Sequence, residues 1–250
     1  MKIPSSYDVV GNIAILPEDT KSPNQVAKSL LKTFKHIETI AIKTKIHSGK
    51  FRLQKTKILA GKKTKTTLHK ENNCFFKLNI DQTYFSPRLS TERLRISKLV
   101  KNNESILVMF SGIAIYPITI SKHSKAKEIY AVEINPKAVE FAAENLKLNK
   151  INNVKLYSGD ARSIVPKLKL KFDRIIMPLP GSAHEFLDVA LEKLKPKGVI
   201  HMYDFESKED IPRKSIEKIK KYLKKPKILN VQKVGQYSPR KYRVCVDFKI

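Results

Sequence analysis

The sequence predicts an α/β fold in which a seven-stranded, doubly wound sheet follows a smaller α/β domain. From about residue 86 onward, short apolar runs of the kind buried in parallel sheets alternate with segments of helical periodicity. The chain then ends at residues 242–250 in a strict alternation of apolar and polar side chains, which is typical of an antiparallel strand. We therefore place a small basic domain at residues 1–85 and a larger domain at residues 86–250.

The first domain is predicted to contain one helix packed on a sheet. Ser22 and Pro23 form a helix start signal, because proline is well tolerated at the first helical position. The apolar residues that follow share one helical face, which we expect to be buried: Val26, Ala27, Leu30, Leu31 and Phe34. Strands are expected at residues 9–16, 39–42, 55–60 and 66–80.

The second domain is predicted to hold five parallel strands, at residues 105–111, 128–134, 154–159, 172–177 and 198–204. Two helices between them have clear start signals: Asn135 followed by Pro136, and a capping box formed by Ser182 and Glu185. Residues 228–235 and the alternating run at the end of the chain bring the sheet to seven strands.

The composition predicts an acidic partner. The 250 residues include 50 Lys and Arg but only 23 Asp and Glu, a formal net charge of +27, and both predicted domains share the basic excess. Nucleic acid is the partner that such a distribution favours. A lysine-rich composition unrelated to binding is the alternative, and charge alone leaves it open.

Several classes of protein are disfavoured. The longest uncharged apolar stretch, residues 106–120, is interrupted by Ser111, Gly112 and Pro117 and falls short of the roughly 20 residues that a bilayer needs, so we expect no membrane partner. Two cysteines are too few for a disulfide scaffold, and the six scattered histidines show no ligand spacing, so we expect no metal. The first residues lack a signal-peptide core, and we expect a cytoplasmic monomer.

Ligand-binding residues are expected after the strands of the second domain, because an open parallel sheet binds its ligand at the carboxyl ends of its strands. The first strand is followed by a turn with a single glycine, Gly112, which matches the glycine-rich fingerprint of dinucleotide sites poorly. A cofactor without phosphates, such as S-adenosylmethionine, does not need the backbone to come as close, so a turn with one glycine could serve it. Glu133 lies 21 residues beyond Gly112, the spacing of a carboxylate that accepts bonds from ribose hydroxyls, and Asp160 could accept one from an adenine amine. A solvated strand-end charge is the alternative for Glu133.

Two prolines follow the fourth strand. Pro178 and Pro180 fix a rigid turn that faces the expected cofactor, where the methyl acceptor lies in enzymes that use S-adenosylmethionine. A simple lead-in to the next helix is the alternative.

Seven blocks along the chain carry a resemblance to a known family. The most specific is residues 84–93 (YFSPRLSTER), because no constraint of the fold explains it; the others are residues 3–8, 69–72, 135–136, 144–145, 183–186 and 237–240. In these blocks the chain resembles the archaeal tRNA guanine-37 methyltransferases over essentially its whole length. The resemblance implies a Rossmann-like, class I S-adenosylmethionine-dependent methyltransferase domain preceded by a small RNA-binding domain, with the anticodon loop of tRNA as partner.

Three departures from the family's usual pattern narrow the resemblance. Val108 stands where the family usually has Asp, and Ala114 where it has a second Gly. Pro178 replaces the Asn of the N1-specific branch, and proline offers neither a side-chain amide nor a backbone N–H to a base. This resembles the bifunctional branch, which methylates guanine-37 at N1 and also the wyosine intermediate 4-demethylwyosine at C7 in tRNA-Phe. The N-terminal domain with which many archaeal members touch the outer corner of tRNA is expected to be absent, which leaves recognition to the two predicted domains.

The resemblance also implies roles for individual residues. Guanine N1 carries a proton, so its methylation needs a base near the ring and a cation near O6, where negative charge accumulates. By resemblance Glu92 is the base and Arg52 the cation. Arg93 is implied to orient the pocket through Glu92 or a phosphate, and Tyr84 to pack on the cofactor or the target base. On the residues alone, Glu92 and Arg52 would be solvated surface charges.

These predictions assign three sets of residues. The catalytic set is Glu92, Arg52, Arg93, Pro178 and Pro180. The cofactor-binding set is Tyr84, Phe110, Gly112, Glu133, Ile134, Asp160, Ala161 and Pro178. The nucleic-acid-binding set is Arg52, Lys70, Arg88, Arg240 and Lys241.

Two other functions stay open. An aminocarboxypropyl transferase would act on the same wyosine intermediate with the same cofactor but transfer a different carbon, and the turn at Pro178 and Pro180 argues against it. A non-catalytic RNA-binding protein on a methyltransferase fold is favoured by Val108 and Ala114 but opposed by the intact acidic residues.

Overall fold

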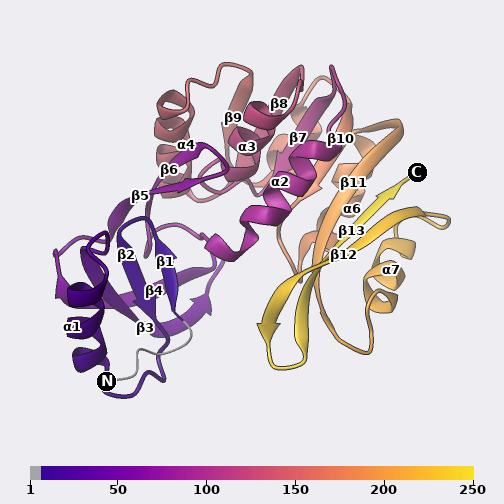
Figure 1. Cartoon of the computed structure of the whole chain (residues 1–250). Coiled ribbons are helices and arrows are strands. Elements are labelled where there is room, and N and C mark those ends of the chain that lie inside the picture. Colours follow the sequence, from indigo (N-terminus) through magenta and orange to yellow (C-terminus); the bar gives the residue numbers. More distant parts are fainter. Residues whose placement is uncertain (1–6) are drawn as a thin grey trace.

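The first domain of the computed structural model is a four-stranded sheet covered by one helix (Figure 1). The structure describes residues 7–250, without the side chains of residues 45–48, so the first part of the motif at residues 3–8 lies outside the described residues. The strands follow the order β1 (Asp8–Val10), β2 (Ile13–Leu16), β3 (Thr39–Ser48) and β4 (Leu53–Gly61). Helix α1 (Pro23–Thr33) connects the parallel strands β2 and β3.

Helix α1 confirms the predicted amphipathic pattern, because Val26, Ala27 and Leu30 are buried against the sheet. The cap prediction is wrong in one respect. Ser22 adopts a left-handed conformation (φ 49°), and among the described residues its side chain makes no cap hydrogen bond. The start of the helix therefore depends on Pro23 and on the buried face.

Two segments predicted as single strands are hairpins. Residues 9–16 fold back at Gly11, whose φ of +56° and close approach to the Leu68 carbonyl leave no room for a side chain. Residues 66–80 form β5 (Thr66–Glu71) and β6 (Cys74–Asn79) around Asn72 and Asn73, which both have positive φ. Paired positive φ values match the twist of a two-residue hairpin, and Asn tolerates them well.

The β5–β6 hairpin packs on both domains. On the side of the first domain, the Gly11 N–H donates to His69 and the Asn12 N–H to the Thr67 hydroxyl, each at 3.1 Å. The amide of Asn145 in helix α4 (Pro136–Leu148) bonds the backbone of Lys77, and the amide of Asn149, the C-cap of this helix, bonds that of Phe75. Phe76 joins a buried cluster with residues of the second domain. The hairpin therefore connects the two domains through shared core and side-chain-to-backbone bonds.

The second domain is built on the predicted seven-stranded sheet (Figure 1). Its strand order is β12-β13-β11-β10-β7-β8-β9. The five strands from β7 to β11 are parallel to one another, whereas β13 lies between β11 and β12 and runs antiparallel to both. The strand bounds are β7 (Ser105–Met109), β8 (Glu128–Glu133), β9 (Val154–Ser158), β10 (Phe172–Met177), β11 (Leu194–Ser207), β12 (Lys227–Ser238) and β13 (Lys241–Lys249).

Helices cover both faces of this sheet, which confirms the doubly wound architecture. One face packs against α2 (Ser90–Leu99), α3 (Ile115–His123) and α4, and the other against α5 (Ala161–Ile164), α6 (Leu187–Glu192) and α7 (Arg213–Lys220). In the part of the chain that the structure describes, none of these helices is long and apolar enough to span a membrane.

The two predicted helix starts in this domain have different outcomes. Asn135 caps α4 as expected, because its side chain accepts the Lys137 N–H at 3.0 Å. The prediction of a capping box at Ser182 and Glu185 is wrong. There the chain forms a 3-10 turn at Ala183–Phe186, in which the main-chain carbonyl of Ser182 already accepts the Glu185 N–H.

Candidate active site

The carboxyl ends of β7, β8, β9 and β10 meet at a cavity of about 150 Å³, which we call the strand-end cavity. The structure brings seven of the eight predicted cofactor-binding residues together in its wall: Tyr84, Phe110, Gly112, Glu133, Ile134, Asp160 and Ala161. Pro178 is not in this wall, whereas its neighbour Leu179 is.

The turn after β7 has an unusual run of left-handed backbone. Phe110, Gly112 and Ala114 have φ of 58°, 57° and 64°. Since a side chain on Gly112 would meet none of the described atoms within 4 Å, glycine is favoured there by conformation and not by crowding. Ala114 adopts the same conformation with a methyl group, at the position where the resemblance implies glycine.

Glu133 is buried at the end of β8 and held by the backbone on both sides. Its carboxylate accepts the Gly112 N–H at 2.7 Å and the Asn135 N–H at 2.8 Å. Burial raises the pKa of Glu133, although these backbone bonds oppose the rise. Each carboxylate oxygen keeps a second lone pair, so the group can still accept bonds from ligand hydroxyls.

The strand-end cavity is closed by a turn of the first domain. Lys50, Phe51 and Arg52, between β3 and β4, line it, and the Lys50 ammonium lies 3.5 Å from the Asp160 carboxylate. Asp160 also caps α5 by accepting the Arg162 N–H at 2.9 Å. Lys50 and Phe51 are missing from the sequence prediction, because nothing in a basic turn near a glycine indicates that it crosses to another domain.

A second cavity of about 580 Å³ adjoins the first and shares Arg52 and Tyr84 with it; we call it the interdomain cavity. Among the predicted residues, Arg52, Tyr84, Arg88 and Pro180 line it. Several other lining residues, drawn from both domains, are absent from the predicted sets: Lys43, Gln54, Ser182, Phe205, Tyr237 and Arg243.

Arg52 and Tyr84 stand where the two cavities meet. Arg52 has φ of 50°, and its guanidinium donates to the Ser182 hydroxyl at 3.4 Å. Burial lowers the pKa of this half-buried guanidinium, though arginine stays protonated. The Tyr84 hydroxyl accepts a bond from Arg243 at 2.8 Å. The junction is therefore lined by two guanidinium groups that could stabilise negative charge.

Glu92 lies apart from both cavities. Its buried carboxylate accepts two bonds from Arg95, at 2.7 and 2.8 Å, and one from the Tyr203 hydroxyl at 2.6 Å. Arg95 in turn donates to Asp247 at 2.6 Å. Glu92 thus belongs to a buried ionic network beneath α2.

Arg93 pairs with Glu71, whereas Glu92 pairs with Arg95. The guanidinium is 2 % exposed and donates twice to the Glu71 carboxylate, at 2.6 and 2.5 Å, and once to the Ser86 carbonyl at 3.1 Å. Burial acts to raise the pKa of Glu71, but bonds from His69 and Arg93 outweigh it and lower the pKa. The pair fastens β5 to α2.

The predicted nucleic-acid-binding residues are spread over several elements. Arg88 bonds Asp8 at 2.8 Å at the edge of the interdomain cavity, and the Lys70 ammonium lies 5.4 Å from the Phe75 ring centre. Arg240 is exposed in the β12–β13 turn, and the Lys241 ammonium lies 5.9 Å from the Phe205 ring centre.

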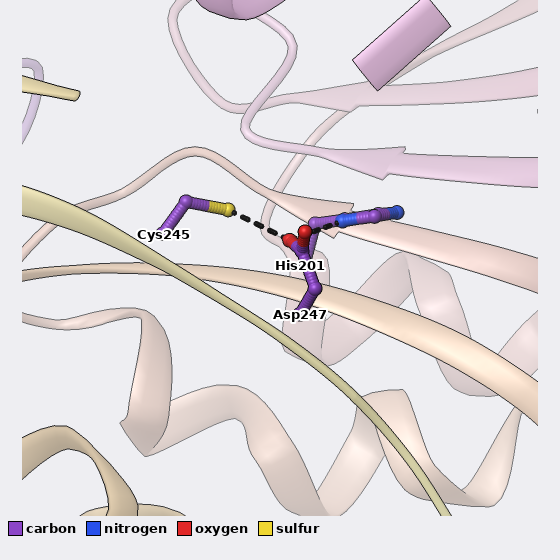
Figure 2. Close-up of side chains that lie close together, drawn as sticks. All are labelled: His201, Cys245 and Asp247. Atoms are coloured by element: carbon purple, nitrogen blue, oxygen red, sulfur yellow. Dashed lines mark hydrogen bonds and ion pairs between the residues drawn. The ribbon is translucent and has the colours of Figure 1, made fainter. Parts of the chain in front are cut away.

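One cluster has the composition of a metal site: His201, Cys245 and Asp247 place potential ligand atoms within 4.8 Å of one another (Figure 2). All three are buried, and Asp247 accepts bonds from both His201 and Cys245. Arg174 lies 2.6 Å from the other ring nitrogen of His201, and Arg95 donates to Asp247. Because two guanidinium groups already occupy the ligand atoms, this cluster fits a structural ionic network better than a cation site.

The fold and the strand-end cavity define a protein with the fold of the S-adenosylmethionine-dependent methyltransferases. The lining of the cavity matches the adenosine part of this cofactor in chemistry, because Phe110, Ile134, Leu179 and Phe186 supply apolar walls for a flat base while Glu133 supplies an acceptor for hydroxyls.

Comparison with known sequences shows the family of the chain. Residues 67–232 match the TRM5/TYW2 methyltransferase domain, and residues 1–64 match the TYW2 N-terminal domain. The chain therefore belongs to the TRM5/TYW2 methyltransferase family. The two matches meet near residue 65, so the β5–β6 hairpin falls in the methyltransferase part, whereas our predicted boundary at residue 85 assigns it to the first domain.

The names of three relatives state different activities. The chain is 36% identical to the tRNA (guanine(37)-N(1))-methyltransferase Trm5b of Pyrococcus abyssi, over 99% of this chain and 76% of the relative. It is 34% identical to the tRNA (guanine(37)-N(1))/4-demethylwyosine(37)-methyltransferase Taw22 of Nanoarchaeum equitans, covering 97% and 98%. It is 35% identical to the tRNA(Phe) (4-demethylwyosine(37)-C(7)) aminocarboxypropyltransferase of Methanocaldococcus jannaschii, covering 97% of each.

Two solved structures agree with these matches. The complex of aTrm5 with tRNALeu superposes with a TM-score of 0.88 at 34% identity, covering 99% of this chain and 72% of that one. M. jannaschii TYW2 in complex with AdoMet superposes with a TM-score of 0.74 at 32% identity, covering 97% and 98%. The cofactor prediction is confirmed by this family membership.

Proposed function

We propose that this protein transfers a methyl group from S-adenosylmethionine to the base at position 37 of tRNA, at N1 of guanine and at C7 of 4-demethylwyosine. The observation that carries the proposal is the pair of adjoining cavities, which share Arg52 and Tyr84. One cavity fits the cofactor, and the other is larger, lined by cationic and aromatic side chains, and open to a base extruded from an RNA loop.

Arg52 is the cation proposed to act on guanine. When bound, the cofactor supplies an electrophilic methyl carbon, and the protein's part is to align acceptor and donor and to stabilise charge. As N1 loses its proton, negative charge moves to O6. A half-buried guanidinium at the junction of the cavities can stabilise that charge more strongly than an exposed one could.

Glu92 is proposed as the proton acceptor. In the structure its carboxylate faces Arg95 and Tyr203, so this role requires it to turn toward the interdomain cavity when tRNA binds. Leu89, three residues before Glu92, lines that cavity. Catalytic geometry commonly tightens only in the substrate complex.

The turn after β10 is proposed to admit the larger tricyclic base. The Leu179 N–H bonds the Met177 carbonyl at 2.9 Å, which places Pro178 at the centre of a tight turn. Leu179 faces the strand-end cavity and Pro180 the interdomain cavity. Since Pro178 has no N–H and no amide side chain, it adds no donor that would select for guanine.

The partner is proposed to be the anticodon loop of tRNA-Phe. The net charge of +27 favours a polyanion, and a related enzyme has been solved with tRNA. Lys70, Arg88, Arg240 and Lys241 are proposed to contact its phosphates.

An aminocarboxypropyl transferase is the second candidate. It is supported by the match of residues 1–64 to the TYW2 N-terminal domain and by the 35% identity to the M. jannaschii transferase. Both reactions use the same cofactor but move different carbons from the same sulfonium.

Two labelled forms of the cofactor distinguish the candidates. The protein is incubated with S-adenosylmethionine labelled either in the methyl group or in the carboxyl group, and with tRNA-Phe bearing guanine or 4-demethylwyosine at position 37. Methyl label in both tRNAs, located by mass spectrometry of the nucleosides, is the expected result. Carboxyl label in the tRNA with 4-demethylwyosine would establish the second candidate. Transfer of neither label, with tRNA still bound, would indicate an RNA-binding protein without catalysis.

A further inference from the structure

A pair of aromatic rings stands at the rim of the interdomain cavity. Phe205 of β11 and Tyr237 of β12 have ring centres 4.2 Å apart and planes tilted by 37°. Both rings line the interdomain cavity but not the strand-end cavity. Tyr237 is 48% exposed, so one large aromatic surface remains open to solvent.

The Phe205 ring of this pair is held in place by packing. The closest described atom to a side chain built on Gly181 would be the Phe205 ring, at 3.5 Å, so the ring lies against the loop that follows Pro180. The orientation of Tyr237 is thus linked to the turn where we propose the target base to sit. An aromatic ring on a rigid support loses little conformational entropy when it stacks on a ligand.

Cations surround the aromatic pair. The Arg243 guanidinium and the Lys241 ammonium lie 5.6 and 5.9 Å from the Phe205 ring centre. Arg52, Tyr237 and Arg243 all line the interdomain cavity, so these groups surround one space. Aromatic rings that offer a face for stacking, with cations for the backbone, are the combination that binds single-stranded nucleic acid.

We propose that Tyr237 stacks on a nucleobase that flanks position 37, forming a second base-binding subsite beside the target pocket. This proposal rests on the proposed function. The target base must reach the junction at Arg52 and Tyr84 to meet the cofactor, whereas Tyr237 lies at the rim of the larger cavity. When a base is extruded from a loop, its neighbour loses a stacking partner, and an exposed aromatic ring can replace it. Because every base has a flat face, the subsite tolerates any base there.

The test measures binding of the protein to a complete tRNA that carries 2-aminopurine next to position 37. One tRNA carries it on the 5′ side and a second tRNA on the 3′ side, and the subsite is assigned to the side that responds to Tyr237. Stacking quenches the fluorescence of this base analogue. Wild-type protein is expected to quench it, and Tyr237→Phe to retain the quenching because the ring remains. Tyr237→Ala is expected to lose the quenching and to bind tRNA about 5- to 150-fold more weakly, the range for removal of one base-stacking ring.

A matched control and an abasic substrate separate stacking from general damage. Tyr222→Ala removes a tyrosine of similar exposure (41%) outside both cavities and is expected to bind like wild type. Removing the flanking base from the tRNA is expected to weaken wild-type binding about as much as Tyr237→Ala does, with no further loss when both changes are combined. Additive losses, or quenching by Tyr237→Ala equal to that of wild type, would overturn the subsite.

The fluorescence signal does not depend on group transfer. If the wild-type protein modifies position 37 but Tyr237→Ala leaves the signal unchanged, the subsite is wrong and the proposed function stands. If no group is transferred but the signal still depends on the Tyr237 ring, the subsite is supported and the proposed activity is wrong.

Discussion

His201 is held as a neutral imidazole by its two buried partners. Arg174 lies 2.6 Å from Nε2, and because a guanidinium can only donate, Nε2 must accept. The proton therefore resides on Nδ1, which donates to Asp247 at 2.6 Å. Protonation of Nε2 would break the bond to Arg174 and place two cations together. Burial accordingly lowers the pKa of His201, although Asp247 opposes this effect.

This lowered pKa predicts a loss of stability in acid. In the unfolded chain His201 takes up a proton near pH 6.5, whereas in the folded protein it resists, so the unfolded state binds more protons below that pH. The free energy of unfolding is expected to fall as the pH drops below about 6.5, by at most about 1.4 kcal/mol per pH unit from this residue. Urea unfolding between about pH 5 and pH 8 measures it. His201→Gln should flatten the dependence; the same slope in both proteins would contradict the assignment.

Glu133 gives a second prediction at this scale. Glu133→Ala is expected to weaken binding of S-adenosylmethionine by about 1.5–3 kcal/mol, the value of hydrogen bonds to a charged group. Titration calorimetry measures the change. Glu128→Ala, at the opposite end of β8 where the carboxylate bonds Lys155, is the control and should bind normally. Unchanged affinity in Glu133→Ala would remove this residue from the cofactor site.

At the scale of elements, α2 is tied to the β5–β6 hairpin by one buried ion pair. Arg93→Ala leaves the Glu71 carboxylate buried beside no guanidinium, and we expect the free energy of unfolding to fall by about 3–5 kcal/mol. Arg88→Ala, which removes a mostly exposed partner of Asp8, should change it by no more than about 1 kcal/mol. Urea denaturation of the two variants makes the comparison. Similar small losses would mean that the Arg93 pair does not fasten the hairpin.

The turn of residues 177–180 predicts a change in the proposed reactions. Pro178→Asn restores an amide where the N1-specific branch has one, and we expect it to change the ratio of N1 to C7 methylation. Pro180→Ala should lower both, because it loosens the turn that aligns acceptor and methyl group. Mass spectrometry of nucleosides from the two tRNA substrates measures the ratio. Equal loss of both activities in a folded, cofactor-binding Pro178→Asn variant would show that this residue shapes the turn without choosing the substrate.

The elements also show how far the sequence could predict this structure. Periodicity located the seven strands of the large sheet, and the strand-end rule located Gly112, Glu133 and Asp160, because these depend on local pattern and on a general property of parallel sheets. The sequence pattern could not place Lys50 or Tyr237 at the cavities, because their positions depend on how one element packs against another that is distant in the sequence. The ion pair of Arg93 with Glu71 was missed for the same reason: its residues lie 22 positions apart on different elements.

At the scale of the whole molecule, the candidate site lies where the two domains meet. The turn of Lys50, Phe51 and Arg52 closes the strand-end cavity from the first domain, and the interdomain cavity takes its wall from both. The basic excess is distributed over both domains as well. A tRNA bound across this junction would therefore contact cations of each domain, and their contributions can be counted.

The salt dependence of tRNA binding gives the number of phosphate contacts that these cations make. Each phosphate neutralised by Lys or Arg releases counterions, so the logarithm of the affinity should fall linearly with the logarithm of salt concentration. Changing Arg240 of the β12–β13 turn and Lys241 at the start of β13 to Gln should lower the slope by about two, or about one for each phosphate contact removed. Tyr237→Ala should weaken binding at every salt concentration but leave the slope unchanged, because stacking releases no counterions. Filter-binding titrations from roughly 50 to 200 mM salt measure all three. An affinity that is flat over this range would show that the interface does not depend on phosphate contacts.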